Sequence, residues 1–350
     1  MKIGNKTLGE QTYVIAEFGV NHNGSFERAM EAIEAVAEAG ADAIKFQTYT
    51  AKELVVKGTP KFWNWDGDKH YETQYDAYEA LGGAPYEWYP KLRKHCRDNG
   101  IEFLSTPFSF KAADYLNDIG MKAFKVASSD MSTLPYLEHI AKYNKPILLS
   151  TGASTLEEVK EAVETIEKAG NKKIVIMQCT LSYPTPDEHA NFAVLQTYKK
   201  HFPRKIIGLS DHTLGSLSSI IGCAMGAQVI EKHFTLDKTL GESADHWLSV
   251  DPKELKEIVD GVRKVDKLRG TDVKGLSVAE RETRELDKRS IVSNGKIAAG
   301  QVITRRMVTF KRPGTGIPPR ELEDVLGRTA LADIDNDTIL TWRHFQKKST

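Results

Sequence analysis

Short apolar runs recur along the chain from residue 13 to about residue 265. Each is rich in β-branched or aliphatic residues and ends in polar side chains; the eight runs lie at 13–19, 43–48, 102–108, 123–129, 147–152, 174–180, 206–213 and 229–234. Stretches with apolar residues at helical spacing separate the runs, as in "FERAMEAIEAVAEAG" (26–40), where Ile33 and Val36 share a face and Gly40 ends the pattern. The pattern predicts strands that alternate with helices.

This alternation is typical of one fold class. Eight strands, each followed by a helix, over roughly 250 residues have the size and order of a (β/α)8 TIM barrel. A doubly wound parallel sheet is the alternative arrangement of the same elements. The stretch 49–85 after the second run is unusually long. We expect an insertion of this length to act at the mouth of the barrel.

The pattern changes after residue 265. A charged stretch with little apolar periodicity comes first, and short β-like runs with turn dipeptides follow it. We therefore predict a barrel domain at 1–268, a linker at 269–288 and a small β-rich domain at 289–350. A domain of that size has a thin core, so we expect it to lean on another surface.

Charge and composition exclude several classes of function. The chain has 48 basic and 48 acidic residues and a formal net charge of zero, so no overall field attracts nucleic acid or an anionic membrane. No apolar run reaches the length of a membrane span, and the N-terminus lacks the features of a signal peptide, which predicts a cytoplasmic protein. Cys96, Cys179 and Cys223 lie far apart, which favours buried reduced thiols over a zinc or redox site.

Polar residues at the ends of the predicted strands form the candidate site, because these ends meet at one face of a barrel. Lys45 and Lys125 lie at two such ends, and Ser128, Ser150 and Ser210 at others. A strand lysine can pair with a neighbouring acid such as Glu17 or Glu231. Two lysines together with three serines favour an anionic substrate, a phosphate or a carboxylate.

Two histidines end neighbouring strands. His212 ends the seventh run and His233 the eighth, so their imidazoles are within reach of one divalent ion of the Mn²⁺ or Mg²⁺ kind. A single strand histidine is more often a core residue, and spacing alone leaves both readings open. Asn21 and His22 follow the first strand, where they either form a turn or recognise a hydroxyl group.

The motifs at these strand ends resemble those of a known family. They are "IAEFGVNHNG", "KFQT", "STPFS", "KVASSD", "LSTG", "CTLSYPTP", "GLSDHT", "EKHF" and "KRPGTGI", in order from about residue 10 to residue 345. They resemble the sialic acid synthase (N-acetylneuraminate synthase) family, which joins phosphoenolpyruvate to an N-acetylated hexosamine such as N-acetylmannosamine and releases phosphate. The C-terminal domain resembles the SAF, or antifreeze-like, module. The resemblance implies a transferase that forms a C–C bond.

The resemblance also implies roles for individual residues. The metal ligands would be His212 and His233, with Mn²⁺ as the ion and Mg²⁺ or Co²⁺ as alternatives. The phosphoenolpyruvate-binding residues would be Lys125, Ser128, Ser150 and Ser210 for the phosphate, and Lys45 and Thr106 for the carboxylate. The residues near the sugar and the attacked carbon would be Glu17, Tyr183, Glu231 and Asp245, of which Glu17 and Glu231, with Lys45, form the catalytic set. Arg312 would reach the sugar in the partner subunit's site, which implies a domain-swapped homodimer.

The resemblance leaves the sugar open. Many sialic acid synthases carry an Asn in the segment after strand two, where this chain has "FWNWDGDKHYETQY", and another at the position of Leu181. A 6-deoxy diacetamido sugar, as in legionaminic or pseudaminic acid synthesis, suits a more apolar pocket. "KRPGTGI" favours the sialic and legionaminic branches, whereas "GAPYEW" favours the pseudaminic branch. Two further hypotheses are a Schiff-base aldolase that uses Lys45 or Lys125, and a non-catalytic sugar-binding protein.

Overall fold

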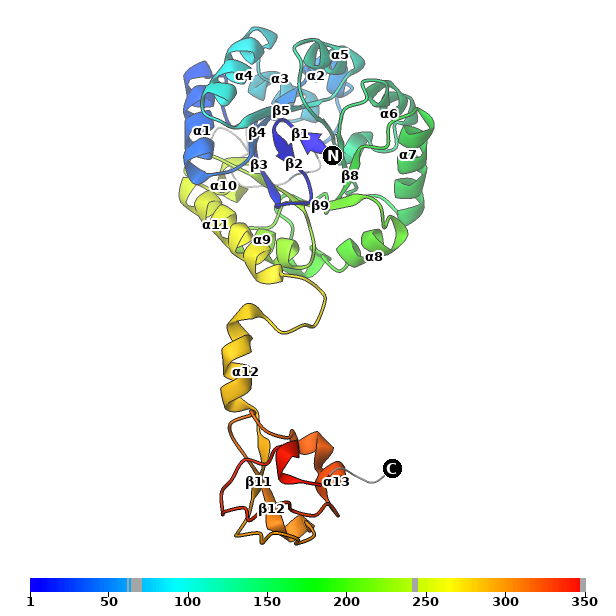
Figure 1. Cartoon of the computed structure of the whole chain (residues 1–350). Coiled ribbons are helices and arrows are strands. Elements are labelled where there is room, and N and C mark those ends of the chain that lie inside the picture. Colours follow the sequence, from blue (N-terminus) through cyan, green and yellow to red (C-terminus); the bar gives the residue numbers. More distant parts are fainter. Residues whose placement is uncertain (62, 64–70, 241–244, 347–350) are drawn as a thin grey trace. The chain divides into compact units, whose positions relative to one another are not determined.

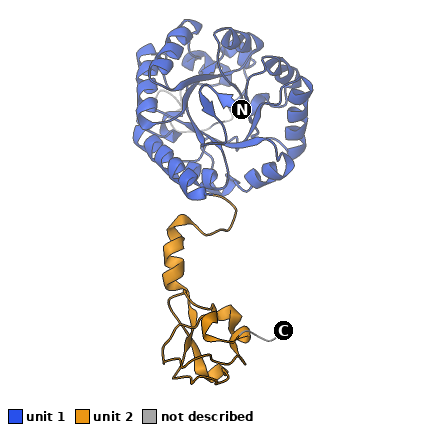
Figure 2. Ribbon diagram, in the orientation of Figure 1, with its two compact units in different colours: residues 1–270 blue, residues 271–350 orange. Residues whose placement is uncertain are grey.

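The computed structural model describes residues 1–61, 63, 71–240 and 245–346 (Figure 1). The chain divides into two compact units, residues 1–270 and residues 271–350, which Figure 2 colours blue and orange. Part of the insertion predicted at 49–85 lies outside the described residues, as do residues 241–244, which precede the predicted site residue Asp245.

The first unit is a ring of eight parallel strands. They are β3 (Tyr13–Gly19), β4 (Ala43–Thr48), β5 (Glu102–Pro107), β6 (Phe124–Val126), β7 (Ile147–Ser150), β8 (Ile174–Cys179), β9 (Ile206–Asp211) and β10 (Val229–His233). They are hydrogen-bonded in the order β5-β4-β3-β10-β9-β8-β7-β6. The last strand of the ring, β10, pairs with the first, β3, which a doubly wound sheet would not do. The predicted TIM barrel is therefore confirmed.

Helices surround the ring, as Figure 1 shows. They are α1 (Phe26–Ala39), α4 (Tyr89–Asp98), α5 (Phe110–Asp118), α6 (Leu134–Ala141), α7 (Leu156–Lys168), α8 (Val194–His201), α9 (Leu217–Ala224) and α11 (Pro252–Arg269). The shorter helices of this unit are α2 (Ala51–Leu54), α3 (Gln74–Leu81) and α10 (Asp245–Leu248), with the 3-10 turns η1 (Tyr86–Trp88), η2 (Ser128–Asp130) and η3 (Asp187–His189). The helix α7 begins at a capping box formed by Thr155 and Glu158, and α1 ends, as the sequence predicted, at Gly40, which adopts a left-handed φ of 82°.

Strand alternation decides which side chains enter the barrel. Outward residues such as Val14, Ile44 and Leu209 pack in the large core shared with the helices. Inward residues at the N-terminal ends of the strands form a second apolar cluster that includes Ile15, Leu104 and Met177. A hairpin of β1 (Lys2–Ile3) and β2 (Lys6–Thr7) contributes Ile3 to the same cluster. The polar inward residues are thus left at the C-terminal ends.

The second unit has a small core of its own. It contains α12 (Arg281–Asp287), the antiparallel pair β11 (Ser290–Ser293) and β12 (Val308–Lys311), α13 (Leu322–Val325), and the 3-10 turns η4 (Val278–Glu280), η5 (Arg305–Met307), η6 (Pro319–Glu321) and η7 (Trp342–His344). Its buried residues include Ile291, Ile303 and Leu340. In neither unit does a described helix combine the length and the apolar character that crossing a membrane requires.

Candidate active site

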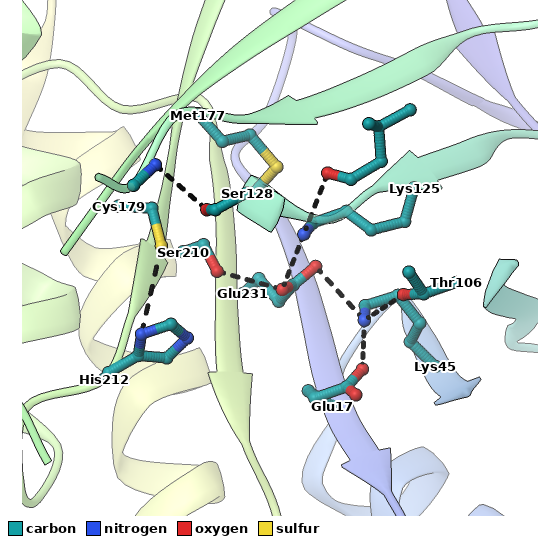
Figure 3. A network of polar contacts seen from close by, with 12 residues as sticks. Glu17, Lys45, Thr106, Lys125, Ser128, Met177, Cys179, Ser210, His212 and Glu231 are labelled. Atoms are coloured by element: carbon teal, nitrogen blue, oxygen red, sulfur yellow. Dashed lines mark hydrogen bonds and ion pairs between the residues drawn. The ribbon is translucent and has the colours of Figure 1, made fainter. Parts of the chain in front are cut away.

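The inward side chains at the C-terminal ends of the strands converge in one buried cluster (Figure 3). Each strand named here supplies one member: Glu17 from β3, Lys45 from β4, Thr106 from β5, Lys125 from β6, Ser150 from β7, Ser210 from β9 and Glu231 from β10. Every one of these side chains belongs to a buried residue. The sequence predicted all seven as site residues, and the nearly closed ring of strands brings them together.

Glu231 lies between the two lysines. Its carboxylate is 3.5 Å from the Lys125 ammonium and 3.8 Å from that of Lys45, and it accepts a hydrogen bond of 3.0 Å from the Ser210 hydroxyl. Lys45 also forms an ion pair with Glu17 and donates to the Thr106 hydroxyl at 2.9 Å. The sequence left two interpretations of the lysines, pairing with a neighbouring acid and binding of an anionic substrate. The contacts are consistent with both, because each lysine meets an acid within a site that contains further donors.

These contacts fix the charge of the cluster. Burial by itself raises the pKa of Glu231, but Lys125 and Lys45 lower it by more, to about 2. Burial lowers the pKa of Lys45, yet the carboxylates of Glu17 and Glu231 offset this and raise the pKa above its ordinary value. Glu231 is therefore a carboxylate and Lys45 an ammonium ion at neutral pH.

Several donors around Lys125 are ready for an anion. The buried hydroxyl of Ser150 has no hydrogen-bond partner. The Ser128 oxygen accepts from the backbone N–H of Gly152 at 2.9 Å, which leaves the Ser128 proton to donate elsewhere. An unpaired buried polar group costs free energy. Together with the Lys125 ammonium, these hydroxyls suit the oxygens of a phosphate.

The two predicted histidine ligands lie side by side. The ring centroids of His212 and His233 are 5.3 Å apart. Nδ1 of His212 lies 2.9 Å from the carbonyl oxygen of Thr180; because a carbonyl only accepts, Nδ1 donates and the Nε2 lone pair remains for a ligand. Nδ1 of His233 lies 3.3 Å from the carboxylate of Asp245. A partner on the far ring nitrogen is what orients histidine ligands in metal sites.

The histidine pair fits a divalent ion that keeps open positions. Among the residues that the structure describes, no group of three His, Cys, Asp or Glu side chains has the arrangement of a metal site. An ion held there would take one nitrogen ligand from each of His212 and His233, and water or substrate oxygens would complete a shell of the kind that Mn²⁺ or Mg²⁺ accepts.

Comparison with known proteins identifies the family. The family model described as the NeuB family matches residues 32–274, and that of the SAF domain matches residues 288–346. The chain belongs to the NeuB family. It is similar to the N,N'-diacetyllegionaminic acid synthase of Campylobacter jejuni serotype O:2, with 36% identity over 95% of this chain and 99% of that protein.

Two further comparisons agree. The pseudaminic acid synthase of Campylobacter jejuni serotype O:23/36 is 35% identical over 96% of this chain and 97% of that protein. The crystal structure of the N-acetylneuraminic acid synthetase of Leptospira borgpetersenii, in complex with citrate, has a TM-score of 0.72 and 29% identity over 81% of this chain and 94% of that one. The resemblance found in the sequence, to both the barrel and the SAF module, is confirmed.

Tyr183 and Cys179 complete the histidine side of this NeuB-family site. The Tyr183 ring lies 4.1 Å from the His212 ring and 5.7 Å from that of His233, between centroids. The Cys179 sulfur is 3.9 Å from His212 Nδ1. All three cysteines are free and buried, as predicted. The position of Cys179 in the site was missed, although its alternation with the inward-facing Met177 would have indicated it.

The sequence also missed an aromatic group beside Asp245. Tyr49 follows β4, and its ring meets the ring of Tyr78 in α3 edge-on, with centroids 5.5 Å apart. Burial and the charge of Asp245 raise the pKa of Tyr78 to about 12. The Tyr49 hydroxyl is buried without a hydrogen-bond partner. The sequence placed the 49–85 insertion at the mouth but did not indicate which of its side chains turn inward.

The loop after β3 is structural. The Asn21 side chain donates to the carbonyl oxygen of Phe234 at 2.8 Å. Nδ1 of His22 accepts from the backbone N–H of Gly24 at 3.0 Å, and its ring packs edge-on against Trp88. Both contacts support the turn reading of this loop rather than hydroxyl recognition.

Arg312 lies in the second unit. Its guanidinium contacts the carboxylate of Asp287 at 2.7 Å, and its side chain is 62% exposed. The structure of the first unit therefore contains every predicted site residue except this one.

Acid should destabilise this protein through His22. Burial, with a smaller contribution from Arg28, lowers the pKa of His22 from 6.5 to about 4. Between these values the unfolded chain binds more protons than the folded one, so the stabilisation is complete above pH 6.5 and falls by up to about 3 kcal/mol toward pH 4. Urea unfolding at pH 7 and pH 5 should show a smaller loss in His22→Asn than in the wild type. Equal losses would contradict the assignment.

Lys45 should not form an imine with pyruvate. Imine formation needs a neutral amine, and the two carboxylates keep Lys45 protonated. After incubation with pyruvate and borohydride, mass spectrometry of the intact protein and its peptides should find no adduct on Lys45. Lys45→Met is the control for labelling elsewhere. A Lys45 adduct formed at neutral pH would support the aldolase hypothesis instead.

Proposed function

We propose that this chain is a nonulosonic acid synthase that condenses phosphoenolpyruvate with an N-acetylated hexosamine and releases phosphate. The observation that carries the proposal is the juxtaposition of two buried lysines and three serines with a pair of histidines oriented through Nδ1. Relatives named as legionaminic and pseudaminic acid synthases, which align over almost the whole chain, support it.

Phosphoenolpyruvate would bind on the lysine side. Lys125 with Ser128, Ser150 and Ser210 would hold the phosphate: the Ser150 hydroxyl is unpaired, and the Ser210 hydroxyl would turn from Glu231 to the phosphate. Lys45, with Thr106, would hold the carboxylate. Because the Lys45 ammonium is fully ionised, it acts as a fixed positive charge and not as a nucleophile.

The amino sugar would bind on the histidine side. His212 and His233 would hold the divalent ion, which we assign as Mn²⁺. When bound, the ion supplies Lewis-acid polarisation of the sugar aldehyde. Tyr183 packs against both imidazoles and would confine the sugar there, and Asp245 would orient both His233 and a sugar hydroxyl.

The reaction forms a C–C bond and a C–O bond, the latter from water, and it breaks the C–O bond to phosphate. C3 of phosphoenolpyruvate attacks the aldehyde carbon, and water adds to the cation formed at C2. Of the two acids, Glu231 is held by two lysines and Ser210, whereas Glu17 contacts Lys45 and accepts from Gln47 at 2.8 Å. We therefore propose that Glu17 orients and deprotonates the attacking water and that the Glu231 carboxylate stabilises the positive charge at C2. Loss of phosphate from C2 then leaves a nine-carbon 2-keto acid.

A 6-deoxy diacetamido hexose is the second candidate for the sugar, beside N-acetylmannosamine. The paired rings of Tyr49 and Tyr78 near Asp245 favour it, because a methyl group would pack against aromatic rings better than a hydroxyl group would. This choice concerns the sugar alone and leaves the phosphoenolpyruvate and metal assignments unchanged.

We further propose a homodimer in which the second units are exchanged. The linker exposes large apolar side chains, among them Val273 at 75% and Val278 at 79%, which a partner surface would cover. Arg312 would reach the N-acetyl group of the sugar in the partner's site, consistent with its exposed position.

The deciding experiment is incubation with phosphoenolpyruvate, Mn²⁺ and a panel that contains N-acetylmannosamine and diacetamido-6-deoxy hexoses. Phosphate release that depends on one sugar, with a product mass equal to the nine-carbon acid, would establish the reaction and the substrate. Absence of phosphate release with every sugar would overturn the proposal and favour the non-catalytic sugar-binding hypothesis.

Replacement of one histidine ligand should abolish turnover. His233→Ala should lower kcat by more than about 100-fold, since loss of a metal ligand costs more than loss of a residue that only hydrogen-bonds to a ligand. Circular dichroism should show an intact fold, and the exposed His189→Ala is the control. Near-normal turnover of His233→Ala, or of the wild type after chelation, would defeat the metal assignment.

Arg312 should matter for the sugar and not for phosphoenolpyruvate. Loss of a hydrogen bond from a charged donor costs about 1.5–3 kcal/mol, so Arg312→Ala should raise the KM for the sugar roughly 10- to 100-fold. The KM for phosphoenolpyruvate should stay within about 2-fold. Arg320→Ala, in the same unit, is the matched control. Equal rises in both KM values would argue against contact with the sugar.

A further inference from the structure

The strands β9 and β10, which end at the two histidines, also carry a buried ion pair on their outer side. Lys232 of β10 and Asp211 of β9 are 1% and 2% exposed, and the Lys232 ammonium is 2.9 Å from the Asp211 carboxylate. Strand alternation turns both side chains away from the barrel interior, toward α9. Gly222 lets α9 approach closely, since a Cβ there would lie 2.3 Å from the Leu209 side chain. None of the chemistry proposed above uses this pair.

Each oxygen of the Asp211 carboxylate accepts two hydrogen bonds. One oxygen accepts from the backbone N–H and the hydroxyl of Thr213, at 2.9 and 2.8 Å. The other accepts from Lys232 and from the Ser219 hydroxyl of α9, at 2.7 Å for the latter. Lys232 also donates to the Thr213 carbonyl oxygen. The carboxylate thus holds the chain on both sides of His212.

Stability alone does not explain such a pair. Replacing a buried ion pair with apolar side chains of similar volume is often neutral or stabilising, because the charges no longer have to leave water. A fully hydrogen-bonded pair instead restricts the local geometry. Here Asp211 and Lys232 are direct partners across the β9–β10 ladder, and each immediately precedes one of the two histidines.

We infer that Asp211 and Lys232 are positioning residues that set the separation of His212 and His233 and thereby the affinity for the divalent ion. This inference rests on the proposed metal site. The pair joins the two strands at the last cross-strand position before the histidines, and its contacts to Thr213 and Ser219 prevent the end of β9 from shifting relative to α9.

The test replaces the pair without leaving an unpaired charge. A single substitution would bury an uncompensated ion and destabilise the fold, so Asp211→Asn is combined with Lys232→Met. The control neutralises a partly buried ion pair at the opposite end of the barrel, where Arg263 contacts the buried Asp42 carboxylate at 2.9 Å. The control variant is Asp42→Asn with Arg263→Met.

Co²⁺ is the probe. Metal-free wild type, His233→Ala and the two double variants are titrated with Co²⁺, and binding is followed by the visible absorption of the bound ion. The Asp211/Lys232 variant should bind Co²⁺ 10- to 100-fold more weakly, the range found for partners of metal ligands, with a shifted absorption band. The Asp42/Arg263 variant should retain the wild-type affinity and band.

Three results would overturn the inference, and each has its own pattern. Wild-type affinity and absorption in the Asp211/Lys232 variant would show that the pair is only structural. Equal weakening in both double variants would indicate a general loss of packing. If the wild type and His233→Ala bind Co²⁺ alike, the proposed metal site itself is wrong, and the positioning role falls with it.

Discussion

Two lysines buried inside a protein have to be compensated, and Glu231 does this for both. Its carboxylate meets Lys125 at 3.5 Å and Lys45 at 3.8 Å, and Glu17 supplies the second negative charge. The charges of the two lysines and the two glutamates sum to zero, which makes burial of the cluster tolerable. The cluster still keeps hydrogen-bond donors for an anion. Because the lysines depress the pKa of Glu231 and the acids raise that of Lys45, the charge state is set before any substrate arrives.

The compensation is possible because the ring closes between β10 and β3. That pairing brings Glu231 near Glu17 although 213 residues separate them in sequence, and it places His233 opposite Glu17 in the register. The same strands carry two polar layers. The inward layer holds the candidate chemistry, and the outward layer, Asp211 and Lys232, holds the strand ends against α9. Because side chains alternate along a strand, a strand of a few residues can place polar groups in both the inward and the outward layer.

The second unit differs from the barrel in the size of its core. Its core is small, and its linker exposes apolar side chains. A domain with so small a core gains stability when it packs against another surface. The match to the SAF domain and the match to the NeuB family fall in separate stretches of the chain, in line with two units that fold around separate cores.

Local pattern determined much of this protein. Apolar runs with polar ends located all eight barrel strands, and Gly40 located the end of a helix, because these features depend on neighbours in sequence. Convergence of Lys45, Lys125 and Glu231 followed from the barrel topology and from the family resemblance. Only the tertiary structure decided which polar strand ends face inward and what each one contacts. It turned Lys232 outward, brought Cys179 to His212 and placed Tyr78 beside Tyr49, because such contacts join residues whose separation no local pattern encodes.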